Sequence, residues 1–302
     1  MSYSEKKLNE FVNLLKAATA DFPINEPKQT NLEGIYVFKG SECGDRYPAV
    51  YDPAIVIMAQ GKKIGRVNDL TMELSVGRFT SIFLPIAWEV EVVEASEEKP
   101  LIMLAIKMDL GRIANILMKM DKVSPIMSAS MSAAPSGIYS EPLTDEILDT
   151  MIRILNMVKN PLEMEVLGEA LLDELYFRLI CSDSSGSMQR LLHHRGDIPQ
   201  ISRAINHIHE NLDEVVSVNK LAEIVNMSPS GFRKIFRDVM HMPPLQYAKS
   251  IKLDQAQIFI RQGLNASEAG YKVGYNSPAQ FSREYKRHFG YTPSETALVP
   301  AR

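Results

Sequence analysis

The stretch GYNSPAQFSREYKRHFGYTP, residues 274–293, decides the fold of the C-terminal third of this 302-residue chain. Ser277 followed by Pro278 is typical of a helix start. The serine hydroxyl can accept a hydrogen bond from a free backbone amide, and proline has no amide to lose in the first turn. Phe281 and Tyr285 then follow at helical spacing and predict one buried face. The stretch therefore predicts a capped helix whose other face, rich in basic and polar residues, lies in solvent.

The same unit occurs 49 residues earlier in the chain, where residues 228–229 are again Ser-Pro and where Phe232 and Phe236 repeat the apolar spacing. A short apolar helix and a tight turn are expected before each capped helix, at about residues 217–240 in the first copy and 265–289 in the second. Helix, turn and basic-faced helix form the helix-turn-helix arrangement, in which the second helix enters the major groove. Two copies with the same placement of Arg and Lys predict a protein that binds double-stranded DNA.

The outward face of each capped helix supplies the side chains expected to contact DNA. They are Ser230, Arg233, Lys234 and Arg237 in the first copy, and Ala279, Gln280, Ser282, Arg283 and Lys286 in the second. Basic side chains bind phosphates and the acceptor edge of guanine, and polar ones can bond to other base edges. A long helix over residues 245–260 is expected to join the units, so that they contact two successive major grooves on one face of the duplex.

Charge divides the chain at nearly the same place. Residues 1–192 hold 19 Lys and Arg against 27 Asp and Glu, a net charge of −8, whereas residues 193–302 hold 14 against 10, a net charge of +4. A basic part appended to an acidic part indicates that only the former meets a polyanion. From charge alone, a solvated helical surface without a ligand is the alternative.

The N-terminal part is predicted to be β-structure followed by helices. Short β-rich runs with turn residues between them lie at residues 35–38, 54–59, 64–67, 70–76, 79–84, 89–93 and 101–108. Such spacing indicates a barrel or sandwich over about residues 30–108. Helical periodicity follows at residues 109–120, 144–158 and 162–180, with a loop expected at 124–140. The predicted fold class is α+β, with an N-terminal domain at residues 1–185, a linker at 186–196 and an all-α domain at 197–300.

No pattern in the sequence predicts an enzyme, a metal site or a cofactor. All six histidines lie beyond residue 192, so the expected barrel has no imidazole for metal binding or general-base work. Nucleotide-binding, hydrolase and zinc-protease motifs do not occur. The two cysteines form no disulfide framework, and no apolar run reaches the roughly 18 residues that span a membrane. We therefore expect a cytoplasmic protein with no membrane partner.

Two residues of the N-terminal domain are candidates for an effector site. Cys43 is predicted to lie in a loop near Arg46, whose charge would lower the pKa of the thiol and make it a sensor. An unreactive cysteine is the alternative. Trp88, near Pro85, could line a pocket or belong to the core. Neither residue identifies the effector.

Residues 195–297 resemble the DNA-binding domain of the AraC/XylS family of transcription regulators, most clearly at residues 274–293. Two departures are His241, where many members have glycine, and Ala266, where a larger aliphatic residue is usual. The N-terminal domain resembles, more loosely, the cupin-like regulatory domain of one AraC subgroup. The resemblance implies a cupin-like β-barrel that binds a small-molecule effector or a protein partner, trailing helices that form a homodimer, and activation with RNA polymerase. An effector-responsive activator, and a regulator whose barrel is an interaction or scaffold module, are both left open.

Overall fold

The computed structural model describes residues 3–123, 136–157, 160–183 and 197–299. Its N-terminal strands form two antiparallel sheets. The order in the six-stranded sheet is β1 (Lys28–Gln29), β2 (Ile35–Gly40), β9 (Leu101–Lys107), β4 (Ala54–Gln60), β7 (Arg78–Ile82) and β10 (Ile138–Pro142). The order in the four-stranded sheet is β3 (Tyr47–Tyr51), β8 (Ile86–Glu94), β5 (Lys62–Val67) and β6 (Leu70–Leu74).

The two sheets face each other and do not close into one hydrogen-bonded barrel. Side chains from both fill the space between them: the Nζ atom of Lys63, on β5, lies 4.3 Å from the ring centroid of Phe38, on β2. The predicted α+β fold class is confirmed, with an open cupin-like sandwich in the place of the barrel. The expected loop at residues 124–140 is wrong at its end, because Ile138 begins β10, which pairs with β7 at the sheet edge.

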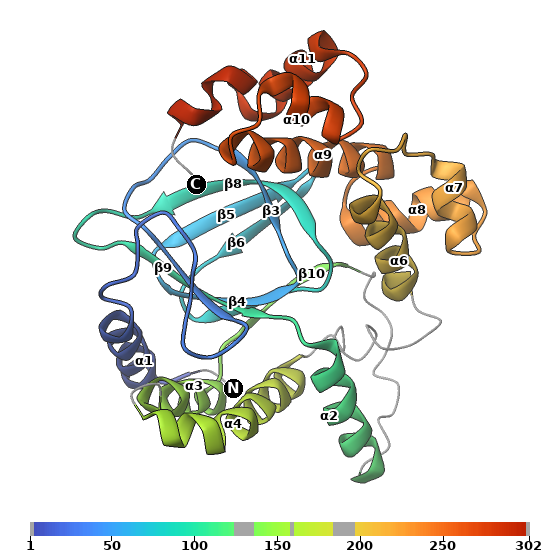
Figure 1. Ribbon diagram of the computed structural model, residues 1–302. Coiled ribbons are helices and arrows are strands. Elements are labelled where there is room, and N and C mark those ends of the chain that lie inside the picture. Colours follow the sequence, from blue (N-terminus) through green and yellow to red (C-terminus); the bar gives the residue numbers. More distant parts are fainter. Residues whose placement is uncertain (1–2, 124–135, 158–159, 184–196, 300–302) are drawn as a thin grey trace.

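Three helices cover the outward face of the six-stranded sheet (Figure 1). They are α1 (Glu5–Ala18), α3 (Asp145–Met157) and α4 (Pro161–Ser182). The predicted break between α3 and α4 is confirmed at Asn160, whose side chain accepts hydrogen bonds from the amides of Leu162 and Glu163 while Pro161 occupies the first turn. This is the cap that the Asn-Pro pair predicts.

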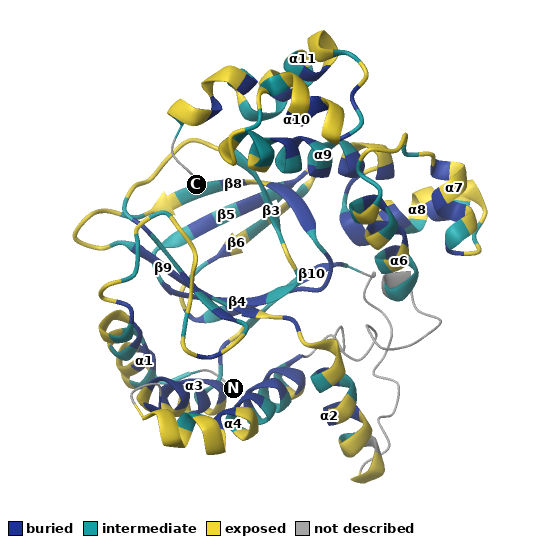
Figure 2. Ribbon diagram, in the orientation of Figure 1, coloured by how far each residue is buried: buried dark blue, intermediate teal, exposed yellow. Residues whose placement is uncertain are grey.

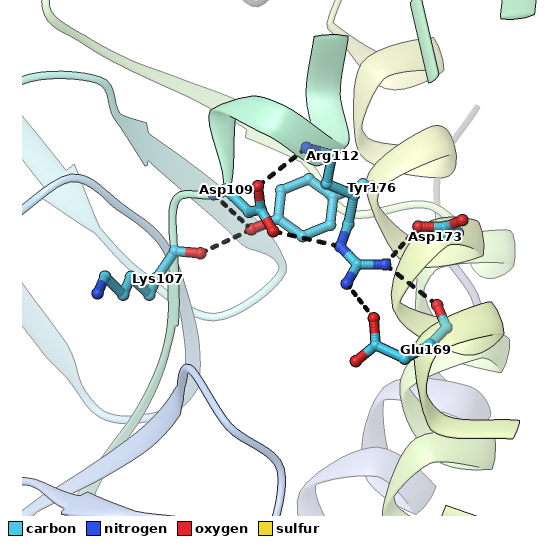
Figure 3. A network of polar contacts seen from close by, with 6 residues as sticks. All are labelled: Lys107, Asp109, Arg112, Glu169, Asp173 and Tyr176. Carbon is cyan, nitrogen blue, oxygen red and sulfur yellow. Dashed lines mark hydrogen bonds and ion pairs between the residues drawn. The ribbon is translucent and has the colours of Figure 1, made fainter. Parts of the chain in front are cut away.

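A polar network fastens α4 to the end of β9 and to α2 (Leu110–Val123) (Figure 3). The hydroxyl of Tyr176, on α4, donates to the carbonyl of Lys107 over 2.6 Å and accepts from the amide of Asp109 over 3.0 Å. The Arg112 guanidinium pairs with the carboxylates of Glu169 and Asp173 on α4. The position of α4 is therefore set by the sheet on one side and by α2 on the other.

The C-terminal part is helical, and in Figure 1 it lies against the four-stranded sheet, on the side away from α1, α3 and α4. Its elements are α6 (Asp197–Glu210), α7 (Val218–Ile224), α8 (Pro229–Met240), α9 (Pro244–Arg261), α10 (Ala266–Lys272), α11 (Pro278–Phe289) and the 3-10 helix η1 (Pro293–Leu298). The buried residues of the first helix-turn-helix unit join the sandwich core in one cluster. The second unit has its own cluster, built on the end of α9. The predicted linker at residues 186–196 lies outside the described residues.

Candidate DNA-binding interface

The first candidate recognition helix is α8. The Ser228 hydroxyl accepts a hydrogen bond from the amide of Gly231 over 3.2 Å, and Pro229 follows in the first turn. The helix buries Phe232 and Phe236 against its unit and ends at His241. His241 has a φ of 56°, in the left-handed region that favours glycine.

The second candidate, α11, is built in the same way. The Ser277 hydroxyl accepts from the amide of Gln280 over 3.3 Å, Pro278 follows, and Phe281 and Tyr285 are buried. The helix ends at Gly290, with a φ of 84°. Gly290 lies 49 residues after His241, so the internal repeat extends to the left-handed residue that stops each helix. His241 thus keeps the conformation for which many family members use glycine, at the steric cost of a side chain.

The predicted contact residues lie on the outward faces of α8 and α11. All are exposed except Ser282, which is half-buried: Ser230, Arg233, Lys234, Arg237, Ala279, Gln280, Arg283 and Lys286. Among the described residues, none of their five cationic side chains forms an ion pair or a hydrogen bond. Unpaired cations beside short polar groups are what phosphate and base contacts require. Their contact with DNA stays a prediction.

One predicted contact residue is held by a neighbour. The Gln280 side chain donates to the Glu284 carboxylate over 3.3 Å, which also accepts from the hydroxyl of Tyr275 over 2.9 Å. Lys249, on α9, forms an ion pair with Glu284 over 3.3 Å. These partners hold the pKa of Glu284 below its usual range, although burial opposes them. The carboxylate therefore stays charged and restrains the Gln280 side chain in the absence of DNA.

No sequence pattern indicated the residues that hold the two helix-turn-helix units in position relative to each other. A Cβ at Gly274, whose φ is 82°, would lie 2.3 Å from the carbonyl oxygen of Asp213 in the first unit. Beside it, the Nζ atom of Lys252, on α9, donates to the carbonyl of Glu214 over 2.8 Å. The absence of a side chain at Gly274 thus allows both a left-handed turn and a close approach to the other unit. The presence of glycine at this position was the one feature of the sequence that could have indicated such a contact.

The sandwich holds the C-terminal end of α8. The amide of Gly137 donates to the carbonyl of Val239 over 2.8 Å, and the Asn68 side-chain amide donates to the carbonyl of His241. The His241 Nε2 atom lies 3.0 Å from the Ser136 hydroxyl, and burial lowers the pKa of this imidazole. A change in the sandwich can therefore reach a candidate recognition helix directly.

The structure does not bring the two effector candidates into one site. Trp88 is buried inside the sandwich, where its ring lies against Gly65 and its Nε1 atom has no hydrogen-bond partner in the part of the chain that the structure describes. Cys43 is exposed, and its thiol donates to the carbonyl of Val93 over 3.2 Å. Lys63, which sequence reasoning missed, is buried near Trp88 and donates to the Tyr51 hydroxyl over 3.2 Å.

Within the described ranges, no group of three or more His, Cys, Asp or Glu side chains is placed to hold a metal ion. No helix of these ranges is long and apolar enough to cross a bilayer.

Two family models match the chain. Residues 31–187 match the AraC-type transcriptional regulator N-terminus, and residues 221–298 match a helix-turn-helix domain. Among curated relatives, the HTH-type transcriptional regulator AlkR of Acinetobacter baylyi is 34% identical over 96 residues, 32% of this chain and 31% of AlkR. The transcriptional activator RclR of Escherichia coli is 34% identical over 98 residues, 32% of this chain and 34% of RclR. Each match spans about a third of the relative's length.

Solved structures show the fold of nearly the whole chain. ToxT from Vibrio cholerae superposes with a TM-score of 0.59 at 11% identity, covering 87% of this chain and 97% of ToxT. At this identity the likeness concerns the fold alone. The matched families and relatives are transcription regulators, which confirms the prediction that the chain is not an enzyme. Because one family model covers more than half of the chain, the chain belongs to the AraC/XylS family of DNA-binding transcription regulators.

Proposed function

We propose that this chain is a transcription activator that reads DNA with α8 and α11. The observation that carries the proposal is the equivalence of these two capped helices, each with an exposed basic face, on units that Gly274 and Lys252 hold together. Activation is supported by relatives named as activators, RclR and the virulence regulon activator VirF of Yersinia enterocolitica, which is 23% identical over 179 residues. RNA polymerase is then the expected protein partner.

Arg233 and Arg283 are the proposed base-reading pair, because they project from the exposed face about one turn inside each helix. Duplexes selected by the full chain from a random pool should contain two contacted segments about 10–10.5 bp apart. Arg233→Ala and Arg283→Ala should each weaken binding to a selected duplex by about 1–3 kcal/mol and relax base preference in one segment. Electrophoretic mobility shift and footprinting measure both effects.

The matched control is Arg203→Ala, since Arg203 is exposed on α6, in the same domain but outside both capped helices. It should change affinity by less than either test variant. Insertion of about 5 bp between the contacted segments turns one of them to the opposite face of the duplex and should weaken binding sharply. Unchanged footprints in both arginine variants would contradict the placement of α8 and α11 in the major groove. Unchanged affinity after the insertion would mean that only one of the two units contacts DNA.

We also propose that the N-terminal domain makes the activator responsive to a small-molecule effector. The contacts of Gly137 and Asn68 with the end of α8 support this, because they give the sandwich a direct route to DNA binding. One ToxT structure, similar in fold at a TM-score of 0.56, is described as bound to an unsaturated fatty acid. The alternative is a sandwich that docks a protein partner. A metabolite that changes the affinity of the full chain for DNA would favour the effector.

The proposed assembly is a cytoplasmic homodimer joined through α4. Its N-terminal half exposes an apolar stripe in which Leu162 is 72% and Val166 is 67% exposed. Ala170 continues the stripe one turn later, and Figure 2 shows exposed residues along the outward side of this helix. Exposed apolar residues at helical spacing are suited to a second copy of the same helix.

A further inference from the structure

A cavity lies outside the sandwich, between the outward face of the six-stranded sheet and the three helices that cover it. Its volume is about 80 Å³. The residues that form its walls come from α1, β9 and α3 and include Phe11, Leu15, Leu104, Ile106, Ile154 and Leu155. Protein interiors are close-packed and hold few voids larger than a water molecule. A cavity of this size offers several times the roughly 10–15 Å³ that one water molecule needs.

The cavity is suited to an apolar molecule. Its walls are almost wholly aliphatic and aromatic, and the two threonine side chains among them are bonded to nearby backbone carbonyls. The Thr19 hydroxyl donates to the carbonyl of Leu15 over 2.7 Å, and the Thr30 hydroxyl donates to that of Leu32 over 3.2 Å. The walls therefore leave no buried polar group that would need a polar ligand body or water.

Polar groups lie beside two of the lining residues, Asn31 and Phe22. The Asn31 side chain is exposed and makes no hydrogen bond to any described residue. Lys28 places its Nζ atom 4.9 Å from the ring centroid of Phe22, which lines the cavity. Lys39 donates to the carbonyl of Phe22 over 3.3 Å. A ligand with an apolar body could therefore place a single polar head group beside Asn31 or beside the lysines next to Phe22.

We propose that this cavity is the effector site, and that the effector is a small apolar molecule with one polar head group. The inference rests on the effector response proposed above and gives it a place and a ligand class. Trp88 and Cys43 are not part of this site, since neither lines the cavity.

Two of the helices that form the cavity walls, α4 and α1, also contact other parts of the N-terminal domain. Leu175, on α4, lines the cavity, and its neighbour Tyr176 fastens the same helix to the end of β9. The other wall, α1, buries Leu8, Phe11 and Leu15 and is joined to α3 by the ion pair between Lys7 and Asp149 over 2.6 Å. Phe11 and Leu15 line the cavity, so a ligand that fills it contacts α1 as well as α4, the proposed dimer helix.

The test uses the full chain and 1-anilinonaphthalene-8-sulfonate, whose fluorescence rises in apolar sites, as the probe. Ala18 lines the cavity and is half-buried, so the side chain of Ala18→Phe should occupy part of the cavity with little disturbance of the core. Ala17, the neighbouring residue on the exposed side of α1, gives the matched control Ala17→Phe. We expect Ala18→Phe to weaken probe binding at least about 10-fold and Ala17→Phe to change it less than about twofold.

Displacement of the probe by 1-octanol and by octanoate then identifies the head group. Displacement by both supports a site that accepts either head, and displacement by one alone selects a neutral or an anionic head. Asn31→Ala, a change at an exposed lining residue that leaves the apolar walls intact, should weaken binding of the displacing ligand several-fold. Failure of both compounds to displace the probe, or equal probe binding in Ala17→Phe and Ala18→Phe chains of equal thermal stability, would overturn the proposal.

DNA binding separates this inference from the function on which it rests. The unmodified chain should bind its selected duplex without any probe, and 1-octanol or octanoate should change that affinity in the Ala17→Phe chain but not in the Ala18→Phe chain. Absence of DNA binding in the unmodified chain would contradict the proposed function itself. Normal DNA binding with the same ligand effect in both variants would contradict only the cavity as the effector site.

Discussion

At the residue scale, Lys63 is the group that the structure places least expectedly. It is buried between the sheets with aromatic rings around its ammonium group, and no carboxylate of the described residues forms an ion pair with it. Burial lowers the pKa of Lys63, and Tyr47 opposes this less strongly. The unfolded chain therefore holds this proton more readily than the folded chain. The free energy of unfolding should rise as the pH rises toward the ordinary lysine value of 10.5.

Lys63→Met should remove this cost while keeping the volume of the side chain. We expect the free energy of unfolding at pH 7 to rise by about 1–4 kcal/mol, and its increase toward alkaline pH to become smaller. Urea denaturation at several pH values measures both. Lys62→Met is the control, because Lys62 forms a partly exposed ion pair with Glu73 over 2.8 Å. It should change the free energy of unfolding by less than about 1 kcal/mol. A less stable Lys63→Met chain would mean that the aromatic contacts outweigh the desolvation of the charge.

At the scale of elements, α4 connects the sheet, the cavity and the proposed dimer. Val166→Lys places a charge in the exposed apolar stripe, where a second copy of α4 would have to desolvate it. We expect the dissociation constant of the dimer to rise at least about 10-fold, measured by sedimentation equilibrium of the full chain. Val215→Lys makes the same change at a valine that is 81% exposed between α6 and α7, and it should leave association unchanged. Equal association of both variants would move the dimer contact away from α4.

At the scale of the whole molecule, the sandwich and the first helix-turn-helix unit are joined at the end of α8. Asn68 has a φ of 48° and donates to the carbonyl of His241. Asn68→Gly keeps the left-handed turn and deletes the hydrogen bond. One such bond contributes about 0.5–1.5 kcal/mol, so hydrogen exchange of the Gly137 amide, bonded to Val239, should become about 2- to 12-fold faster. Asp69→Ala, in the same turn, should leave exchange unchanged. Equal exchange in both variants would show that Asn68 does not hold the two parts together.

The helical units could be predicted from the chain because their signals are local. Ser228 and Ser277 accept bonds from amides three residues away, and the aromatic residues that pack each unit recur four residues apart. Such spacing fixes which face of a helix is buried and which is exposed. The candidate DNA-contacting face could therefore be predicted residue by residue from the chain itself.

Contacts between segments that are distant in the chain are seen only in the folded molecule. β10 pairs with β7 through residues 56 positions apart, as Ile138 does with Ile82, and no local pattern in its short polar sequence announces that pairing. Lys63 is buried because a second sheet covers it, and the cavity exists because α1 lies beside α3 across more than a hundred residues of chain. The left-handed turn at Gly274 can be suspected from its glycine, but its approach to Asp213 cannot. Burial and pairing of this kind depend on which surfaces meet, and a sequence pattern records only the neighbours along the chain.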